Sequence, residues 1–200
     1  VKLFEIQHLT PGIAVFGLSF ITLFSATIIA KDRGSSLLQR LYTTPLTPMD
    51  FILGYTLPMI PIAIAQCIIC YIAAMILGLE MTEGIFFAII FIIPISFLYI
   101  ALGLLCGSIF NDKQVGGICG ALLTNLSAWL SGTWFDLDLV GGTFRKIAYA
   151  LPFVHAVELE RAVLTENYAE IFPHLWWVLG YALALLILAV LLFLRQMKKQ

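Results

Sequence analysis

The segment KDRGSSLLQRLYTTPLTPMD, residues 31–50, is a polar and basic interruption in an otherwise apolar chain. The residues on either side of it, 9–30 and 51–79, carry no charge. Of the 200 residues, 61% are hydrophobic and 12% are charged, whereas a soluble domain is about one quarter charged. A single soluble core could not bury this much apolar surface, so the composition indicates a protein that spans a lipid bilayer.

Five stretches are long and apolar enough to cross the hydrocarbon core, which requires about 20 residues. We expect them at about residues 9–30, 54–79, 85–110, 115–135 and 175–194. Pro58 and Pro61 predict a kink or an interfacial turn near the start of the second stretch. The sequence therefore predicts an all-α polytopic membrane protein with a single transmembrane domain over residues 1–200.

The charges differ between the two ends of these spans. One end carries residues 31–50, the NDKQ turn at 111–114 and the C-terminus, and holds seven basic and three acidic residues. The other end holds four basic and nine acidic residues. Because basic residues in short loops favour the cytoplasmic side, we expect residues 31–50 and the C-terminus in the cytoplasm. An outside N-terminus without a signal peptide favours a further span upstream of residue 1.

Within the polar segment, residues 36–43 have the periodicity of one short amphipathic helix. A serine precedes it as N-cap, and Thr44-Pro45 ends it. Its apolar residues share one face: Leu37, Leu38, Leu41 and Tyr42. A helix of about two to three turns is unstable alone in water. We therefore expect support from the membrane surface or from a cytoplasmic partner protein, and the pattern alone leaves both open.

These residues resemble the permease subunit of type-2 ABC exporters. The resemblance rests on a span, the segment KDRGSSLLQRLYTTPLTPMDFILG, a second span, the NDKQVGG turn and a long outside segment before the last span. It covers essentially the whole chain and implies six spans per subunit, so that a first span and an external domain would precede residue 1. It also implies that residues 31–50 contain the coupling helix, whose contacts with a separate ABC ATPase would be Leu37, Leu38, Arg40, Leu41 and Tyr42.

The function implied by the resemblance is export across a bacterial plasma membrane. The substrate would be hydrophobic or amphipathic, such as a drug in multidrug efflux, an antimicrobial, a lipid or a glycan. Two permease subunits, alike or unlike, would enclose the path. The chain contains no GxxxxGK[ST] motif, so we expect ATP and Mg²⁺ on the partner ATPase and neither a cofactor nor an ATPase site on this chain. A net charge of −1 gives no indication of nucleic-acid binding.

Small residues recur at four-residue spacing in the third and fourth spans, where they permit close approach of helix backbones. We expect packing within the subunit or a seam to a second subunit at Gly103, Gly107, Gly116, Gly120, Ser127 and Ser131. The fourth span is also the most polar, and an amide in hydrocarbon requires a partner or a wet cavity. Interhelical hydrogen bonds or a substrate path are therefore expected at Thr124, Asn125 and Trp129.

Residues 136–174 are too charged to span the bilayer and predict an extracytoplasmic amphipathic segment. We expect a helix at 148–164 that lies along the outer membrane face or dips into it. It holds His155 and Glu158 three residues apart, with His174 further along. This is a weak signal for metal binding or acid–base chemistry, and it supports one alternative function, a membrane-embedded enzyme that acts on lipids. The preferred interpretation assigns no catalytic residue and no metal.

Overall fold

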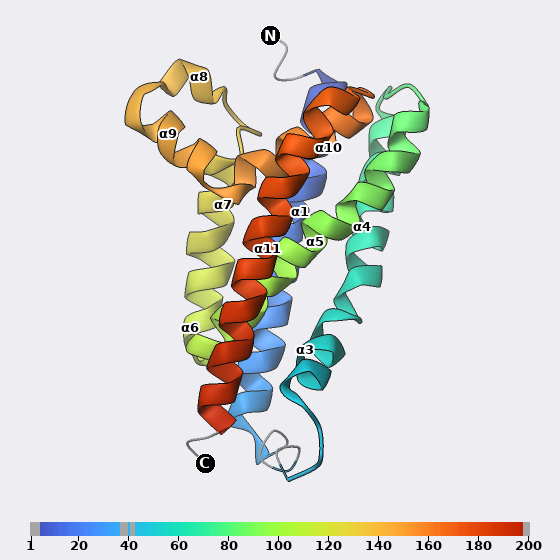
Figure 1. Ribbon diagram of the computed structural model, residues 1–200. Helices are drawn as coiled ribbons and strands as arrows, with labels where there is room; N and C mark the ends of the chain where they lie inside the picture. The colour runs from blue at the N-terminus through green and yellow to red at the C-terminus, as the bar shows by residue number, and fades with distance from the viewer. Residues whose placement is uncertain (1–4, 37–39, 41–42, 198–200) are drawn as a thin grey trace.

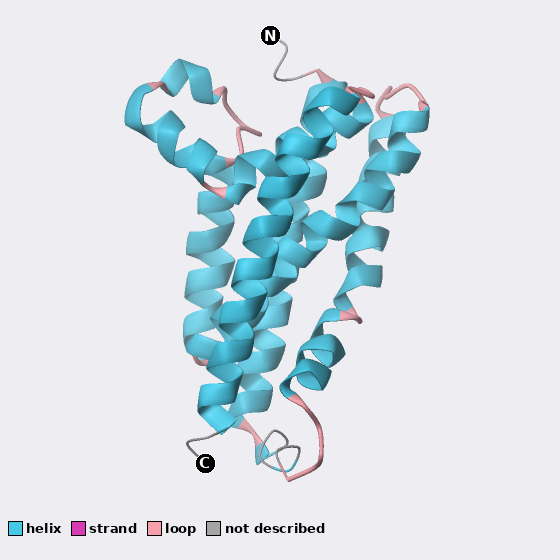
Figure 2. Cartoon of the chain, viewed as in Figure 1, coloured by secondary structure: helices cyan, strands magenta, loops and turns pink. Residues whose placement is uncertain are grey.

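The computed structural model describes residues 5–36, 40 and 43–197. Within that part, four helical stretches are long and apolar enough to cross a membrane (Figure 1). They are α1 (Ile6–Gly34), α3 (Pro48–Thr56) joined to α4 (Met59–Ile76), α5 (Glu83–Ile109) and α11 (Tyr168–Met197). Three consecutive segments make a fifth pass: α6 (Asp112–Gly117), the π-helical turn η2 (Ile118–Leu123) and α7 (Thr124–Leu130). All regular structure described is helical (Figure 2), which confirms the all-α polytopic prediction.

The five passes alternate in direction (Figure 1). The connection from α1 to α3, the start of α6 and the end of α11 lie at one end of the bundle. The α4–α5 loop lies at the other end, together with α8 (Leu137–Val140), α9 (Gly142–Ala150) and α10 (Pro152–Leu164). This is the alternation that five spans require, and which end faces the cytoplasm stays a prediction from charge.

Helices α1 and α5 pack closely at two glycines of the predicted small-residue pattern. A Cβ atom added to Gly103 would lie 2.7 Å from the carbonyl oxygen of Thr22, and one added to Gly107 would lie 2.7 Å from that of Ala26. Thr22 Oγ1 also donates a hydrogen bond of 2.7 Å to the carbonyl of Tyr99 across the same contact. These two glycines therefore serve helix packing within the subunit, as the spacing allowed.

Two capping boxes begin helices ahead of the boundaries expected from hydropathy. The Thr47 backbone N–H donates to Asp50 Oδ2 at 2.7 Å, and Asp50 N–H donates back to Thr47 Oγ1, so α3 begins at Pro48 rather than at residue 54. Asn111 and Gln114 form the same motif, and α6 begins at Asp112 rather than at residue 115. The second pass then breaks between Thr56 and Met59, which agrees with the kink expected around Pro58.

The fourth pass is shorter than predicted. Its helix ends at Leu130 instead of residue 135, because Gly132 adopts a left-handed backbone with φ of 67° that ends the helix. The predicted helix at 148–164 is in fact two helices, since Leu151, which precedes Pro152, is extended.

The packing of α10 bears on the two expected arrangements, a helix that lies along the outer membrane face or one that dips into it. Every residue of α10 except Glu158 is buried. The helix packs against α1, α5 and α11 at the same end of the bundle as α8 and α9 (Figure 1), so other helices rather than solvent or lipid cover most of it, and its depth in a membrane stays a prediction. Apolar residues occur on all its faces, which is the pattern of a buried helix rather than an interfacial one.

The α1–α5 contact predicts different outcomes for two glycines. We expect Gly107→Ala to lower the free energy of unfolding by about 1–3 kcal/mol, because the added methyl overlaps the Ala26 carbonyl. Gly116→Ala is the matched control, since nothing lies within 4 Å of its added Cβ atom. Thermal unfolding in detergent measures both variants, and equal melting temperatures would contradict the close α1–α5 contact.

Candidate functional site

The C-terminal end of α1 is fastened to α5 by Arg33. Its guanidinium donates to the carbonyl oxygens of Gly107 at 3.0 Å, of Phe110 at 3.3 Å and of Ser108. These are carbonyls at the end of α5, where a helix lacks intrahelical donors and where a cation complements the helix dipole. Arg33, which counted in the sequence only as a loop charge, thus joins two passes.

The neighbouring Asp32 makes a second attachment, because the Tyr55 hydroxyl of α3 donates to its Oδ2 atom at 2.8 Å. The connection between α1 and α3 is therefore held to the bundle at both ends. Within this connection Arg40 is exposed. The other expected ATPase contacts, Leu37, Leu38, Leu41 and Tyr42, lie outside the described residues, so the docking face stays a prediction.

The polar residues of the fourth pass divide between two faces. Thr124, Ser127 and Ser131 are buried, and Ser127 Oγ lies 2.7 Å from Ser19 Oγ of α1. That contact is an interhelical hydrogen bond of the kind expected here. Thr124 Oγ1 donates to the Cys119 carbonyl at 2.9 Å inside the π-helical turn, so Thr124 faces the bundle and not an open path.

The opposite face of this pass is open. A Cβ atom added to Gly116 meets nothing within 4 Å, whereas one added to Gly120 would contact the Leu23 side chain of α1 at 3.4 Å, so Gly120 faces α1. Asn125 and Trp129 are exposed and four residues apart, so they share one helical face. Asn125 Nδ2 donates to a carbonyl of its own pass, Ala121 O, at 2.7 Å. The expected interhelical bond from Asn125 is therefore not formed within the described chain.

At the other end of the bundle, Arg161 of α10 is buried and donates to three acceptors. Nε contacts the His8 carbonyl at 3.2 Å, Nη2 contacts the Gly132 carbonyl at 3.1 Å, and Nη1 contacts Glu158 Oε1 at 2.7 Å. A buried guanidinium is tolerated only when its donors are satisfied. Arg161 thus links α10 to the start of α1 and to the turn after α7. In the sequence it counted only as one of the basic residues at this end of the spans.

Glu160, next to Arg161, brings a carboxyl group into the bundle. It is fully buried, and its Oε1 accepts a hydrogen bond of 3.0 Å from the Tyr71 hydroxyl of α4. Its Oε2 has no hydrogen-bond partner in the described residues. Burial raises the pKa of Glu160 to about 8. No predicted span contains an acid, but α10 supplies one. The sequence contains no local signal for its burial, because Glu158 and Arg161 lie beside it.

The two histidines singled out in the sequence converge at this end. Their Nδ1 atoms lie 2.9 Å apart, and His155 Nε2 lies 2.9 Å from the Tyr149 carbonyl oxygen. Because a carbonyl only accepts, Nε2 of His155 carries a proton, and in the neutral pair His174 Nδ1 donates to His155 Nδ1. Glu158 instead binds Arg161, and residues 5–36, 40 and 43–197 contain no cluster of three metal-ligating side chains.

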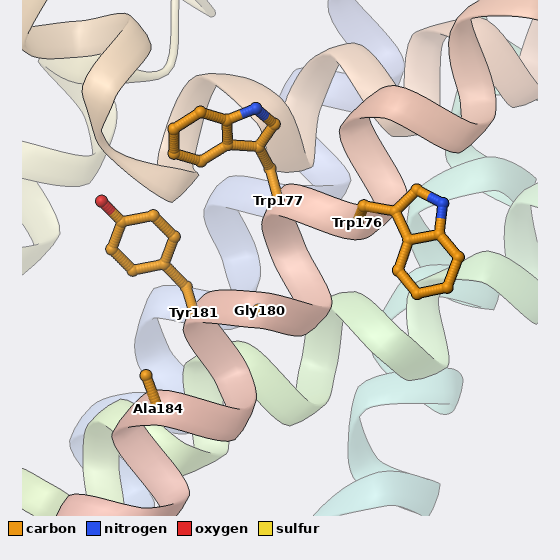
Figure 3. Close-up of a pocket in the computed structure, with 5 residues that line it drawn as sticks. All are labelled: Trp176, Trp177, Gly180, Tyr181 and Ala184. Carbon is orange, nitrogen blue, oxygen red and sulfur yellow. The ribbon is translucent and has the colours of Figure 1, made fainter.

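An open groove of about 410 Å³ lies along α11, with the lining residues drawn in Figure 3. Its lining is Trp176, Trp177, Gly180, Tyr181 and Ala184. The Trp177 ring stacks on the His155 ring with centroids 4.8 Å apart, and Tyr181 donates to the Ala150 carbonyl at 2.6 Å. These contacts fix the rings of Trp177 and Tyr181 in place. The lining of the groove is apolar and contains no charged residue.

The four cysteines contribute to helix packing. Cys67, Cys106 and Cys119 are buried, Cys70 is half-buried, and none of the four forms a disulfide. Cys106 and Cys119 belong to the contact between α1, α5 and the fourth pass.

Comparisons with known proteins agree with this architecture. A sequence model of the family described as "ABC-2 family transporter protein" matches residues 5–191. The capsule polysaccharide export inner-membrane protein CtrC of Neisseria meningitidis serogroup B is 29% identical over 125 residues. This alignment covers 62% of the chain and 47% of CtrC, so the chain spans about half the length of that relative. No solved structure gives a significant match.

The buried Arg161 predicts a large loss of stability on substitution. We expect Arg161→Met to lower the free energy of unfolding by about 3 kcal/mol, because it leaves the Glu158 carboxylate and two carbonyls without their donor. Arg145→Met is the control, since Arg145 pairs with Asp138 at the surface and should contribute less than about 1 kcal/mol. Unfolding in detergent compares them, and similar losses would contradict the role of Arg161.

The buried carboxyl group of Glu160 predicts a pH-dependent stability. The unfolded carboxyl loses its proton near its ordinary pKa of 4.5, whereas burial holds the folded pKa at about 8. The folded state therefore binds more protons between these values, and the melting temperature should fall as pH rises from 5 to 8. Glu160→Gln should flatten this slope, while Glu170→Gln at an exposed position should keep it. An unchanged slope in Glu160→Gln would contradict the assignment.

Proposed function

Because the chain belongs to the ABC-2 family of transporter proteins, we propose that it is the membrane-spanning permease subunit of an exporter driven by a separate ABC ATPase. ATP and Mg²⁺ would bind to that ATPase, in keeping with the absence of a GxxxxGK[ST] motif from these 200 residues. The observation that carries the proposal is the double attachment of the connection between α1 and α3.

This connection is suited to transmitting force. Asp32 joins the end of α1 to α3 through Tyr55, and Arg33 joins it to the end of α5. A displacement imposed on residues 36–44 would therefore act on α1, α3 and α5 together instead of bending a loose loop. The exposed Arg40 would contact the ATPase, together with the apolar face formed by Leu37, Leu38, Leu41 and Tyr42.

We place a second permease subunit, alike or unlike, against the open face of the fourth pass. Gly116 leaves room there for another helix, and the exposed amide of Asn125 would be costly in lipid. A second subunit or a wet substrate path between the two subunits would provide hydrogen-bond partners for Asn125. Trp129 on the same face would line that path.

Among a drug, an antimicrobial, a lipid and a glycan, we favour a glycan as the substrate. The support is the name of the relative, which describes capsule polysaccharide export at an inner membrane. We accordingly place the protein in a bacterial plasma membrane, with residues 31–50 and the C-terminus in the cytoplasm, as the basic residues at that end favour.

The alternative function, an enzyme acting on lipids, would depend on His155 and His174. His155 is only 6% exposed, and each of its ring nitrogens already lies within hydrogen-bond distance of a protein atom. A general base must reach the proton that it removes, and this geometry leaves none of its nitrogens open to a substrate. His155 therefore supports the packing of α10 against α11 better than it supports catalysis.

Substitution of the proposed docking face tests the function. We expect the double variant Arg40→Glu with Leu41→Asp to reduce co-purification with the ATPase by about tenfold or more, because it reverses a charge and adds another at an interface. ATP-dependent export should fall in parallel. Lys146→Glu, an exposed change at the opposite end of the bundle, is the control and should leave both intact. Normal assembly and export in the double variant would contradict the docking assignment.

A further inference from the structure

A pocket of about 540 Å³ opens between the end of α1 and the beginning of α6. Its lining comes from both passes: Ala30, Lys31 and Gly34 on one side, and Asn111, Asp112 and Lys113 on the other. None of these lining residues is among those to which the ATPase contact was assigned, and nothing in the proposed function uses the pocket.

Two lysines make the lining of this pocket positively charged. Lys31 and Lys113 are exposed, and neither makes a hydrogen bond or an ion pair within the part of the chain that the structure describes. Asp112 is the acid of the lining, which leaves a net charge of +1. The Asn111 side chain caps α6 by accepting from Gln114 N–H at 3.0 Å, so it helps to fix the wall that carries Lys113.

The pocket lies where the apolar spans end. Ala30 is the last residue of the uncharged run in α1, and Asn111 directly precedes the fourth pass. In a bilayer this boundary is the level of the lipid headgroups. Lysines at this level can keep their ammonium groups among phosphates while their stems lie along apolar surface.

An apolar track leads from the pocket toward the middle of the bilayer. Phe20, Phe24 and Lys31 fall on one face of α1, and the two phenylalanines are 46% and 57% exposed. The fourth pass packs against α1 beside them. There Gly117 lacks a side chain and has open space around it. The surface thus offers room for an acyl chain directly adjoining a site for a phosphate.

We propose that this pocket binds the phosphate headgroup of an anionic phospholipid, held by Lys31 and Lys113, with an acyl chain along Phe20 and Phe24. The lipid would bridge α1 and the fourth pass beside the anchor that Arg33 makes to α5. Its chemistry differs from general attraction to an anionic surface, because it requires two lysines from different passes and the apolar track between them.

The test measures retention of phosphatidylglycerol by the purified, delipidated full chain, using native mass spectrometry. Phosphatidylcholine with the same acyl chains is the lipid control. We expect tighter retention of phosphatidylglycerol, weakened about thirtyfold in the Lys31→Gln, Lys113→Gln double variant. Lys146→Gln removes an exposed lysine at the opposite end and should change nothing. Melting temperatures without added lipid should be equal, since both lysines are exposed and without partners in the described chain.

Two further experiments distinguish binding of a lipid from binding of a soluble anion. Phe24→Ala should weaken retention of long-chain phosphatidylglycerol and leave the short dihexanoyl form unaffected, because only the long chain reaches the track. Competition with inorganic phosphate should displace the lipid only weakly. Equal retention of the two lipid classes, equal losses in the Lys146→Gln control, or full displacement by inorganic phosphate would each overturn the proposal.

Discussion

The guanidinium of Arg161 is the contact on which the end of the bundle that holds α10 depends. A cation removed from water must have its donors satisfied, and Arg161 finds acceptors in α10 itself, at the start of α1 and in the turn after α7. Because these acceptors are fixed in space, they hold α10 between α1, α5 and α11. The burial of Glu160 and His155 follows from that position. One set of three hydrogen bonds thus determines where a charged segment enters an apolar bundle.

The same chemistry acts at the other end of α1, where Arg33 donates to the last carbonyls of α5. Between the two arginines, Gly103 and Gly107 bring α1 and α5 into backbone contact. α1 is therefore joined to α5 along its length and to α10 at its start. The second pass differs, because it is broken between α3 and α4. In the proposed transport cycle, motion between passes would concentrate there.

Hydropathy and helical periodicity were sufficient to find all five passes, because both signals are local. The capping boxes at Thr47 and Asn111 are equally local, and applying the capping pattern would have placed both helix starts. The buried position of α10 was not predictable, because the partners of Glu160 and Arg161 are remote in sequence: Tyr71 is 89 residues away and His8 is 153 residues away. Small-residue spacing identified Gly103 and Gly107 as packing positions, but only the three-dimensional arrangement assigns α1 as their partner.

The π-helical turn in the fourth pass connects this internal packing to the proposed external partner. Because η2 is π-helical, each of its turns holds more residues than an α-helical turn, and this rotates the residues that follow. As a result Ser127 meets Ser19 of α1, and the amide of Asn125 faces outward. The rule that places Arg161 among acceptors applies here as well: a polar group at membrane depth needs a partner. For Arg161 the chain supplies that partner, whereas for Asn125 the same rule favours a second subunit or a hydrated path.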